Sequence, residues 1–103
     1  MKTYTGRREG RAVLVRVNDQ PLNPRLDLRN HSPTGYEWGY GGSGPAQLAL
    51  ALLVDHLGDI EQALDFYQSF KWAVVARLPR WTEWSLTSRD IDQAIAGLPQ
   101  PIG

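Results

Sequence analysis

The stretch GYEWGYGGSGPAQLALALL, residues 35–53, places a glycine-rich loop directly before a segment that is apolar on nearly every side. Ser43 or Gly44 is expected to cap a helix there, with Pro45 at its first helical position. A broad apolar arc then follows at helical spacing: Ala46, Ala49, Leu50, Leu53 and Leu57, extended by Leu48, Leu52 and Val54. A helix with so little polar surface needs cover on more than one side, so it is expected to be the central core element.

Only a narrow strip of this helix, Gln47, Ala51 and Asp55, tolerates water. Leu48, Leu52 and Val54 flank that strip, so part of their surface stays open unless another element covers it. Either a second copy of the chain covers it through a two-fold contact, or tryptophans and the last helix of the same chain do. Exposed apolar patches usually mark interfaces, which favours a homodimer.

The segments around the central helix predict a small antiparallel sheet. Residues 11–19 alternate apolar and polar side chains, and residues 2–10 supply a hairpin partner with the turn at Glu9-Gly10. Residues 36–38 have the pattern of a short aromatic strand. Alternation returns at residues 81–86, so a later strand is expected to rejoin the sheet.

Two further helices are expected. Gly58 ends the first helix, and Asp59 caps a second one that continues until Pro79 forces a stop. A capping-box pattern at residues 87–90 opens a short last helix. The order predicts a single α+β domain over residues 1–103, in which a small antiparallel sheet (the N-terminal strands plus the returning strand near 81–86) packs on two central helices, with a short C-terminal helix.

Composition indicates a cytoplasmic protein. The chain has 103 residues, 42% of them hydrophobic, and no cysteine, so disulfides and thiolate zinc sites are excluded and a reducing compartment fits best. The first ten residues lack an apolar signal region, and the longest apolar run, residues 48–54, is too short to span a bilayer. No membrane association is expected.

Charge is balanced overall but divided along the chain. Residues 1–35 carry seven arginines and lysines against three acids, whereas residues 36–70 carry five acids and no lysine or arginine. A formal net charge of zero makes a general nucleic-acid binder less favoured. The two halves either cancel by pairing on folding, or the arginine-rich strands meet a phosphate or an acidic partner.

The loop imitates three enzyme motifs without completing any of them. Gly39, Gly41 and Gly44 spell the dinucleotide fingerprint, but no buried parallel strand precedes them and a second helix follows directly. A phosphate-binding P-loop needs Lys and Ser or Thr after Gly44, where Pro45 and Ala46 stand.

Ser43 also resembles the serine of a nucleophile elbow, but Pro45 replaces the last glycine of that motif. His56 lies on the same helix, about 20 Å away by helical rise, so it reaches no serine there. Ser43 is therefore expected to be a helix cap. Two separated histidines and no acidic cluster give no metal-ligand spacing, and no cofactor is expected.

Two interpretations of the loop remain. Its amides and the helix N-terminus could hold an anion at residues 42–46. Alternatively, the glycines adopt positive φ and let Tyr36, Trp38 and Tyr40 close over the helix start, which the lack of a neighbouring cation favours. Of the four tryptophans, Trp81 and Trp84 lie three apart in an expected strand, so one of them is expected to be exposed.

The stretch TGYEWGYGGSGPAQLALALL, with YTGRR before it and YQSFKWAVVARLP and WSLTSRDI after it, resembles a family of small proteins that carry a domain of unknown function. The resemblance covers nearly the whole chain, and its core is WGYGGSGPAQLALA. It implies accessory proteins of bacteria, phages and other mobile elements, and brings no activity, cofactor or catalytic residue with it.

These observations predict a non-enzymatic protein-interaction module with an unknown protein partner, as an accessory of mobile elements or host defence. The alternative is a binder of a phosphate-bearing ligand or nucleic acid through the glycine-rich loop. The candidate binding residues are the same for both functions: Trp38, Tyr40, Gly41, Gly42, Ser43, Gly44, Arg7 and Arg16.

Overall fold

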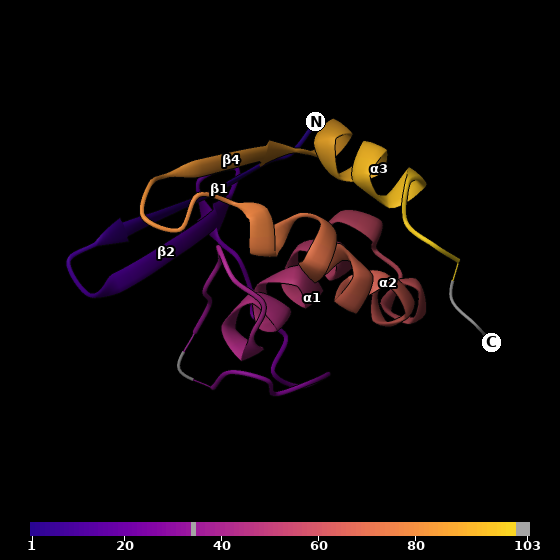
Figure 1. The fold of residues 1–103 in the computed structure, drawn as a ribbon, viewed down its shortest axis with the longest axis horizontal. Helices are drawn as coiled ribbons and strands as arrows, with labels where there is room; N and C mark the ends of the chain where they lie inside the picture. The colour runs from indigo at the N-terminus through magenta and orange to yellow at the C-terminus, as the bar shows by residue number, and fades with distance from the viewer. Residues whose placement is uncertain (34, 101–103) are drawn as a thin grey trace.

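A four-stranded antiparallel sheet, two central helices and a short last helix make up the computed structural model, which describes residues 1–33 and 35–100 (Figure 1). The strands are β1 (Thr3–Glu9), β2 (Ala12–Val17), β3 (Gln20–Pro21) and β4 (Trp84–Thr87), in the order β3-β2-β1-β4. The helices are α1 (Ser43–Leu57), α2 (Ile60–Ala73), the 3-10 helix η1 (Val75–Arg77) and α3 (Ser88–Ala96). This arrangement confirms the expected α+β fold, including the returning strand and the short C-terminal helix.

Successive side chains of β1 alternate between the buried face of the sheet and its solvent-exposed face. Tyr4 and Gly6 are buried, whereas Thr5 and Arg7 point to the opposite, uncovered face of the sheet. Gly6 lies opposite Trp84 in the β1–β4 pairing, and a Cβ at Gly6 would overlap the Trp84 indole. The glycine therefore lets this tryptophan cross β1 and enter the core.

The core is centred on α1, as the apolar pattern predicts. Eleven consecutive residues, Gly44 to Val54, are buried. From Leu48 to Val54 they pack in one cluster with the inner side of the sheet, α2 and Ile91 of α3. Leu48 and Leu52 are fully buried and Val54 is 7% exposed within a single chain. The open apolar surface on which the homodimer expectation rested is therefore already covered by the chain itself.

The water-tolerant strip predicted on α1 is wrong at Ala51, which belongs to the apolar core, and at Gln47, whose side chain is also completely buried. Its carboxamide oxygen accepts hydrogen bonds from the backbone N–H groups of His31 (2.8 Å) and Ser32 (3.2 Å). Its Nε2 donates to the carbonyl oxygens of Pro24 (2.6 Å) and Arg29 (3.0 Å). The segment between β3 and α1 thus folds over the helix and uses Gln47 as its hydrogen-bonding partner.

The helix ends agree with the sequence at the end of α1 and the starts of α2 and α3, but not at the start of α1 or at the end of α2, which lies at Ala73 instead of continuing to Pro79. Gly58 adopts the left-handed conformation, and the Asp59 carboxylate accepts from the Gln62 N–H at 3.1 Å. Thr87 and Asp90 form the complete capping box of α3. At α1, however, Gly42 is the N-cap and no side-chain hydrogen bond caps the helix, so Ser43 is not the cap.

The predicted aromatic strand at residues 36–38 is also wrong, because this segment has no strand partner. It runs instead along the start of α1, where the Cβ of Glu37 occupies the space that a Cβ at Gly44 would need (2.6 Å). Trp38 enters the core and its Nε1 donates to the Pro79 carbonyl oxygen at 3.1 Å. Within the described residues, no helix has the length and apolar character that crossing a bilayer requires.

Candidate binding surface at the glycine-rich loop

The glycines of the loop make room for neighbouring side chains. A Cβ at Gly39 would lie 2.5 Å from the Arg80 Cβ, and one at Gly41 would overlap the Trp72 ring. A Cβ at Gly42 would lie 2.6 Å from a ring carbon of Tyr40. Gly39 has a φ of +85°, but Gly41 and Gly42 do not have positive φ, so the expectation of positive φ was wrong for both. At both positions the missing Cβ instead leaves space in which an aromatic ring lies against the backbone.

Three aromatic side chains and two cations follow one another across this loop. The Arg80 guanidinium lies 4.6 Å from the centre of the Tyr40 ring and 4.9 Å from that of Trp81. The Lys71 ammonium lies 4.4 Å from the centre of the Trp72 ring, which packs on Gly41. We call this set the aromatic band: Tyr40, Lys71, Trp72, Arg80 and Trp81.

Trp72, Arg80 and Trp81 of the aromatic band are exposed to solvent, whereas Tyr40 is partly exposed and Lys71 is only 9% exposed. Trp81 is 74% exposed and Trp72 is 59% exposed, which makes them the two most exposed aromatic side chains among the described residues. One exposed member of the Trp81–Trp84 pair was expected, and Trp84 is indeed only 5% exposed. The exposed ring, however, precedes β4 instead of lying within it.

Arg8 supports the band from behind. Its guanidinium makes two hydrogen bonds to the Glu37 carboxylate, at 2.7 and 3.1 Å, and its Nε donates to the Arg80 carbonyl oxygen at 2.9 Å. It also lies 4.6 Å from the centre of the buried Trp38 ring and 5.3 Å from that of Trp81. The hydrogen bonds from Arg8 hold the pKa of the Glu37 carboxyl below its usual value. One side chain of β1 thus ties together the loop before α1 and the loop before β4.

A family model matches residues 4–97, from β1 through the end of α3. This chain belongs to the family of unknown function DUF6166. The match includes the whole glycine-rich loop and the whole aromatic band. Comparison with curated proteins and comparison with solved structures each give no match.

The loop residues predicted as a binding site are divided between surface and core in this DUF6166 chain. Gly41 and Ser43 are exposed, while Tyr40 and Gly42 are partly exposed. Gly44 is buried. Trp38 has no exposed surface, so its prediction as a surface contact was wrong: its ring packs edge-on against Trp84, with the centroids 5.7 Å apart.

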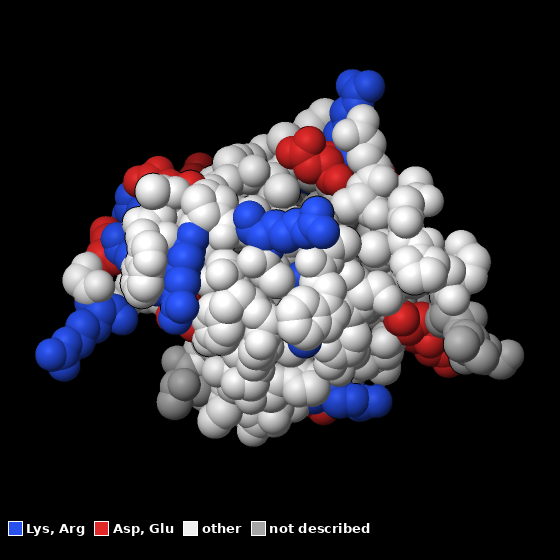
Figure 2. Space-filling model, in the orientation of Figure 1, with Lys and Arg blue, Asp and Glu red and all other residues white. Residues whose placement is uncertain are grey.

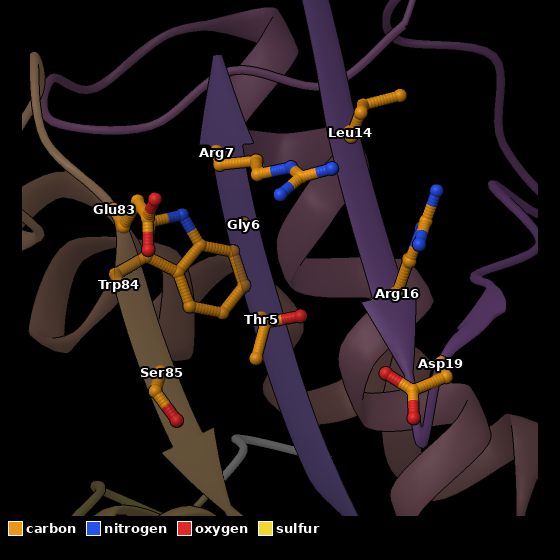
Figure 3. Close-up of a pocket in the computed structure, with 9 residues that line it drawn as sticks. All are labelled: Thr5, Gly6, Arg7, Leu14, Arg16, Asp19, Glu83, Trp84 and Ser85. Atoms are coloured by element: carbon orange, nitrogen blue, oxygen red, sulfur yellow. The ribbon is translucent and has the colours of Figure 1, made fainter. Parts of the chain in front are cut away.

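Arg7 and Arg16 were predicted to flank the loop, but they lie on the outer face of the sheet. There they line a shallow depression of about 390 Å³ together with Thr5, Leu14 and side chains near β4 (Figure 3). Figure 3 shows Arg7 reaching from β1 toward β2, where Arg16 lies further along the strand. Because alternate strand residues face opposite sides, Arg8 and not Arg7 reaches the loop.

The start of α1 offers little room for an anion in this DUF6166 chain. Gly44, Pro45 and Ala46 are buried, and Glu37 packs against Gly44. The Ala46 N–H already donates to the Gly42 carbonyl oxygen at 3.0 Å. The Arg8 guanidinium, which lies beside Glu37, already forms an ion pair with the Glu37 carboxylate at 2.7 Å.

The two histidines have partners far from Ser43 in sequence. The His31 Nε2 lies 2.7 Å from the Tyr67 hydroxyl, and the His56 Nε2 lies 2.6 Å from the Asp92 carboxylate. Over residues 1–33 and 35–100, no three histidines or carboxylates gather as metal ligands.

Lys71, Trp72, Arg80 and Trp81 were not among the binding residues predicted from the sequence. A signal was present, because both tryptophans directly follow a cationic residue, in the dipeptides Lys71-Trp72 and Arg80-Trp81. Only the folded chain shows that these two dipeptides meet at the same loop.

Proposed function

We propose that this chain is a non-enzymatic protein-interaction module whose contact surface is the aromatic band. The observation that carries the proposal is the exposure of Trp72 (59%) and Trp81 (74%) beside Tyr40 and Arg80. Tryptophan, tyrosine and arginine are the residue types most enriched among the residues that dominate binding energies at protein interfaces.

The band is also held in place before any partner arrives. Trp72 rests on Gly41, and Arg80 is fixed through its backbone, which accepts a hydrogen bond from Arg8. A surface that is already ordered loses less conformational entropy on binding. Covering both exposed rings would remove a large apolar area from water, at about 25 cal/mol per Å².

A phosphate-bearing ligand or nucleic acid at the start of α1 has less support. Glu37 covers Gly44 and its carboxylate is paired with Arg8. On the face shown in Figure 2, lysine and arginine side chains form separate groups divided by uncharged and acidic surface. Nucleic-acid binding usually depends on a continuous basic surface. The resemblance to accessory proteins of mobile elements makes phage, mobile-element and host-defence proteins the first partners to test.

The test is a pull-down from the native cell with the wild-type chain and the double variant Trp72→Ser/Trp81→Ser. The matched control is Leu26→Ser/Ile60→Ser, which removes two apolar side chains that are 38% and 41% exposed outside the band. We expect a protein retained by the wild type and the control to be absent with the tryptophan variant.

Two outcomes would contradict the proposal. The first is the same protein set from all three baits. The second is retention of nucleic acid instead of protein, with a steep loss as salt is raised.

A further inference from the structure

We infer that the partner segment that contacts the aromatic band is acidic, with carboxylates placed to meet Lys71 and Arg80 between apolar side chains that cover Trp72 and Trp81. This inference rests on the proposed function and adds the chemistry of the partner to it.

The first argument is the charge of the segments that build the band. Residues 38–54 carry no charged side chain, and residues 71–82 carry Lys71, Arg77 and Arg80 without any aspartate or glutamate. The band is therefore cationic in a chain whose formal net charge is zero. A partner with complementary charge associates faster and is distinguished from competitors that carry like charge.

The second argument is that neither cation of the band has an ion-pair partner within residues 1–33 and 35–100. The Lys71 side chain is only 9% exposed and its ammonium lies over the Trp72 ring, while Arg80 is exposed and, in addition to Arg8, lowers the pKa of the Glu37 carboxyl without pairing with it. Neither Lys71 nor Arg80 is part of the five ion pairs there, whereas Arg8 and Glu37, directly behind the band, pair at 2.7 Å. An aromatic face attracts a cation but leaves its charge uncompensated. Carboxylates from a partner would form charge-assisted hydrogen bonds with both groups while the rings are covered.

The number of free cations favours a protein segment over a nucleic acid. Single-stranded nucleic acids also stack on aromatic rings, but their binding grooves follow the backbone with a continuous series of cations. Here the cations alternate with rings, and the segments that form the band supply three in all. A short peptide stretch that mixes carboxylates with apolar side chains matches this pattern.

The experiment is a selection of random twelve-residue peptides displayed on phage, carried out in parallel on three test baits and one control bait. The test baits are the wild-type chain, Trp72→Ser/Trp81→Ser and Lys71→Gln/Arg80→Gln. A fourth bait, Arg11→Gln/Arg89→Gln, removes two exposed cations outside the band and is the matched control for charge. Circular dichroism and thermal melts establish that each variant is folded before selection.

We expect the wild type and the charge control to enrich peptides rich in aspartate and glutamate with interspersed leucine, isoleucine or valine. A synthetic peptide of the most enriched sequence should bind the Lys71→Gln/Arg80→Gln variant at least about tenfold more weakly, because its carboxylates would be desolvated without charged partners. Its binding should shift the indole N–H resonances of Trp72 and Trp81 and leave those of Trp38 and Trp84 in place.

The outcomes separate the two proposals. Enriched peptides that need Trp72 and Trp81 but lack acidic residues, or that bind the Lys71→Gln/Arg80→Gln variant equally well, overturn the inference and leave the proposed function standing. Failure to enrich any peptide that depends on the two tryptophans overturns both. Stronger binding of single-stranded oligothymidine than of every selected peptide would assign the surface to nucleic acid instead.

Discussion

The ring of Trp72, at the end of α2, lies in the space that a Cβ of Gly41 would occupy, on the loop before α1. A second contact joins the same loop to η1, which follows α2, because the Gly39 N–H donates to the Val75 carbonyl oxygen at 3.0 Å. The glycine-rich loop therefore serves as a flat support for side chains from the α2–β4 region.

Replacing Gly41 and Gly39 should distinguish a glycine that contacts only a movable side chain from one that needs positive φ and lies against the backbone. Gly41→Ala would collide only with the far end of the exposed Trp72 side chain, which can swing away, so we expect a stability change below about 0.5 kcal/mol. Gly39→Ala should cost about 1–3 kcal/mol, because Gly39 has a φ of +85° and its Cβ would meet the Arg80 backbone at 2.7 Å. Urea denaturation measures both changes.

The Trp72 resonances provide the second readout for these variants. Gly41→Ala should shift the Trp72 indole N–H signal while the Trp38 and Trp84 signals stay in place. An unchanged Trp72 signal in folded Gly41→Ala would contradict the packing of this ring on the loop.

Helix caps give a prediction with an internal control. Ser43→Ala should change the free energy of unfolding by less than about 0.5 kcal/mol, because Gly42 caps α1 and no side chain assists it. Thr87→Ala should cost about 1 kcal/mol, since it removes the capping box of α3. Thermal or urea unfolding of both variants checks this, and equal losses would show that Ser43 has a capping role after all.

Gln47 should be the most sensitive polar residue of α1. Gln47→Leu keeps a similar volume but leaves two backbone N–H groups and two carbonyl oxygens of residues 24–32 without their partner. We expect a loss of roughly 3 kcal/mol or more, because each buried unpaired group costs about 1–3 kcal/mol. Gln62→Leu, on exposed surface, is the control and should be near neutral. A Gln47→Leu variant as stable as wild type would mean that this segment detaches easily from α1.

The Arg8–Glu37 pair predicts an acid-dependent loss of stability. Since the folded-state pKa of Glu37 lies below its ordinary value of 4.5, its contribution is complete above that value and is lost as the pH falls through the folded-state pKa. Glu37→Gln should cost about 1 kcal/mol at neutral pH, after allowance for solvent screening of this part-exposed pair. The difference in free energy of unfolding between wild type and variant, measured by urea titration, should disappear as the pH falls from about 5 to about 3. A difference that is constant with pH would rule out the charge as its source.

The buried Tyr4 and the partly buried Tyr36 predict a loss of stability in alkali. Burial, together with the hydrogen bond to Asp55, raises the pKa of Tyr4 above its ordinary value of 10.0, and burial raises that of Tyr36. The unfolded chain releases these protons near pH 10, so stability is complete below that value and declines as the pH rises above it. Tyr36→Phe should flatten this decline between about pH 9 and pH 11, measured by urea unfolding, at the cost of the hydrogen bond to the Leu22 carbonyl oxygen. A decline of unchanged slope would assign the alkaline sensitivity to other groups.

Local interactions explain what could be predicted. The helical spacing after Gly44, the capping residues Asp59 and Thr87 and the alternation in β1, β2 and β4 all act within a few residues along the chain. These determined the α+β fold and the central position of α1. Of the binding residues predicted in the loop, Tyr40 belongs to the aromatic band, Gly41, Gly42 and Ser43 lie at or near the surface beside it, and Trp38 is buried.

Contacts between distant segments decided the rest. Nothing close to Gln47 in sequence shows that residues 24–32 fold over it, and nothing near Trp38 or Trp81 shows which ring fills the core. The alternation of β1 predicts two faces, but only the packing against α1 and the loop decides that Arg8 turns inward and Arg7 outward. The sequence alone therefore determined the main helices and strands and the helix ends at Gly58, Asp59 and Thr87, because these depend on neighbours within about one helical turn or strand pair. Only the tertiary structure decided which side chains form the surface, because that depends on residues brought together from across the chain.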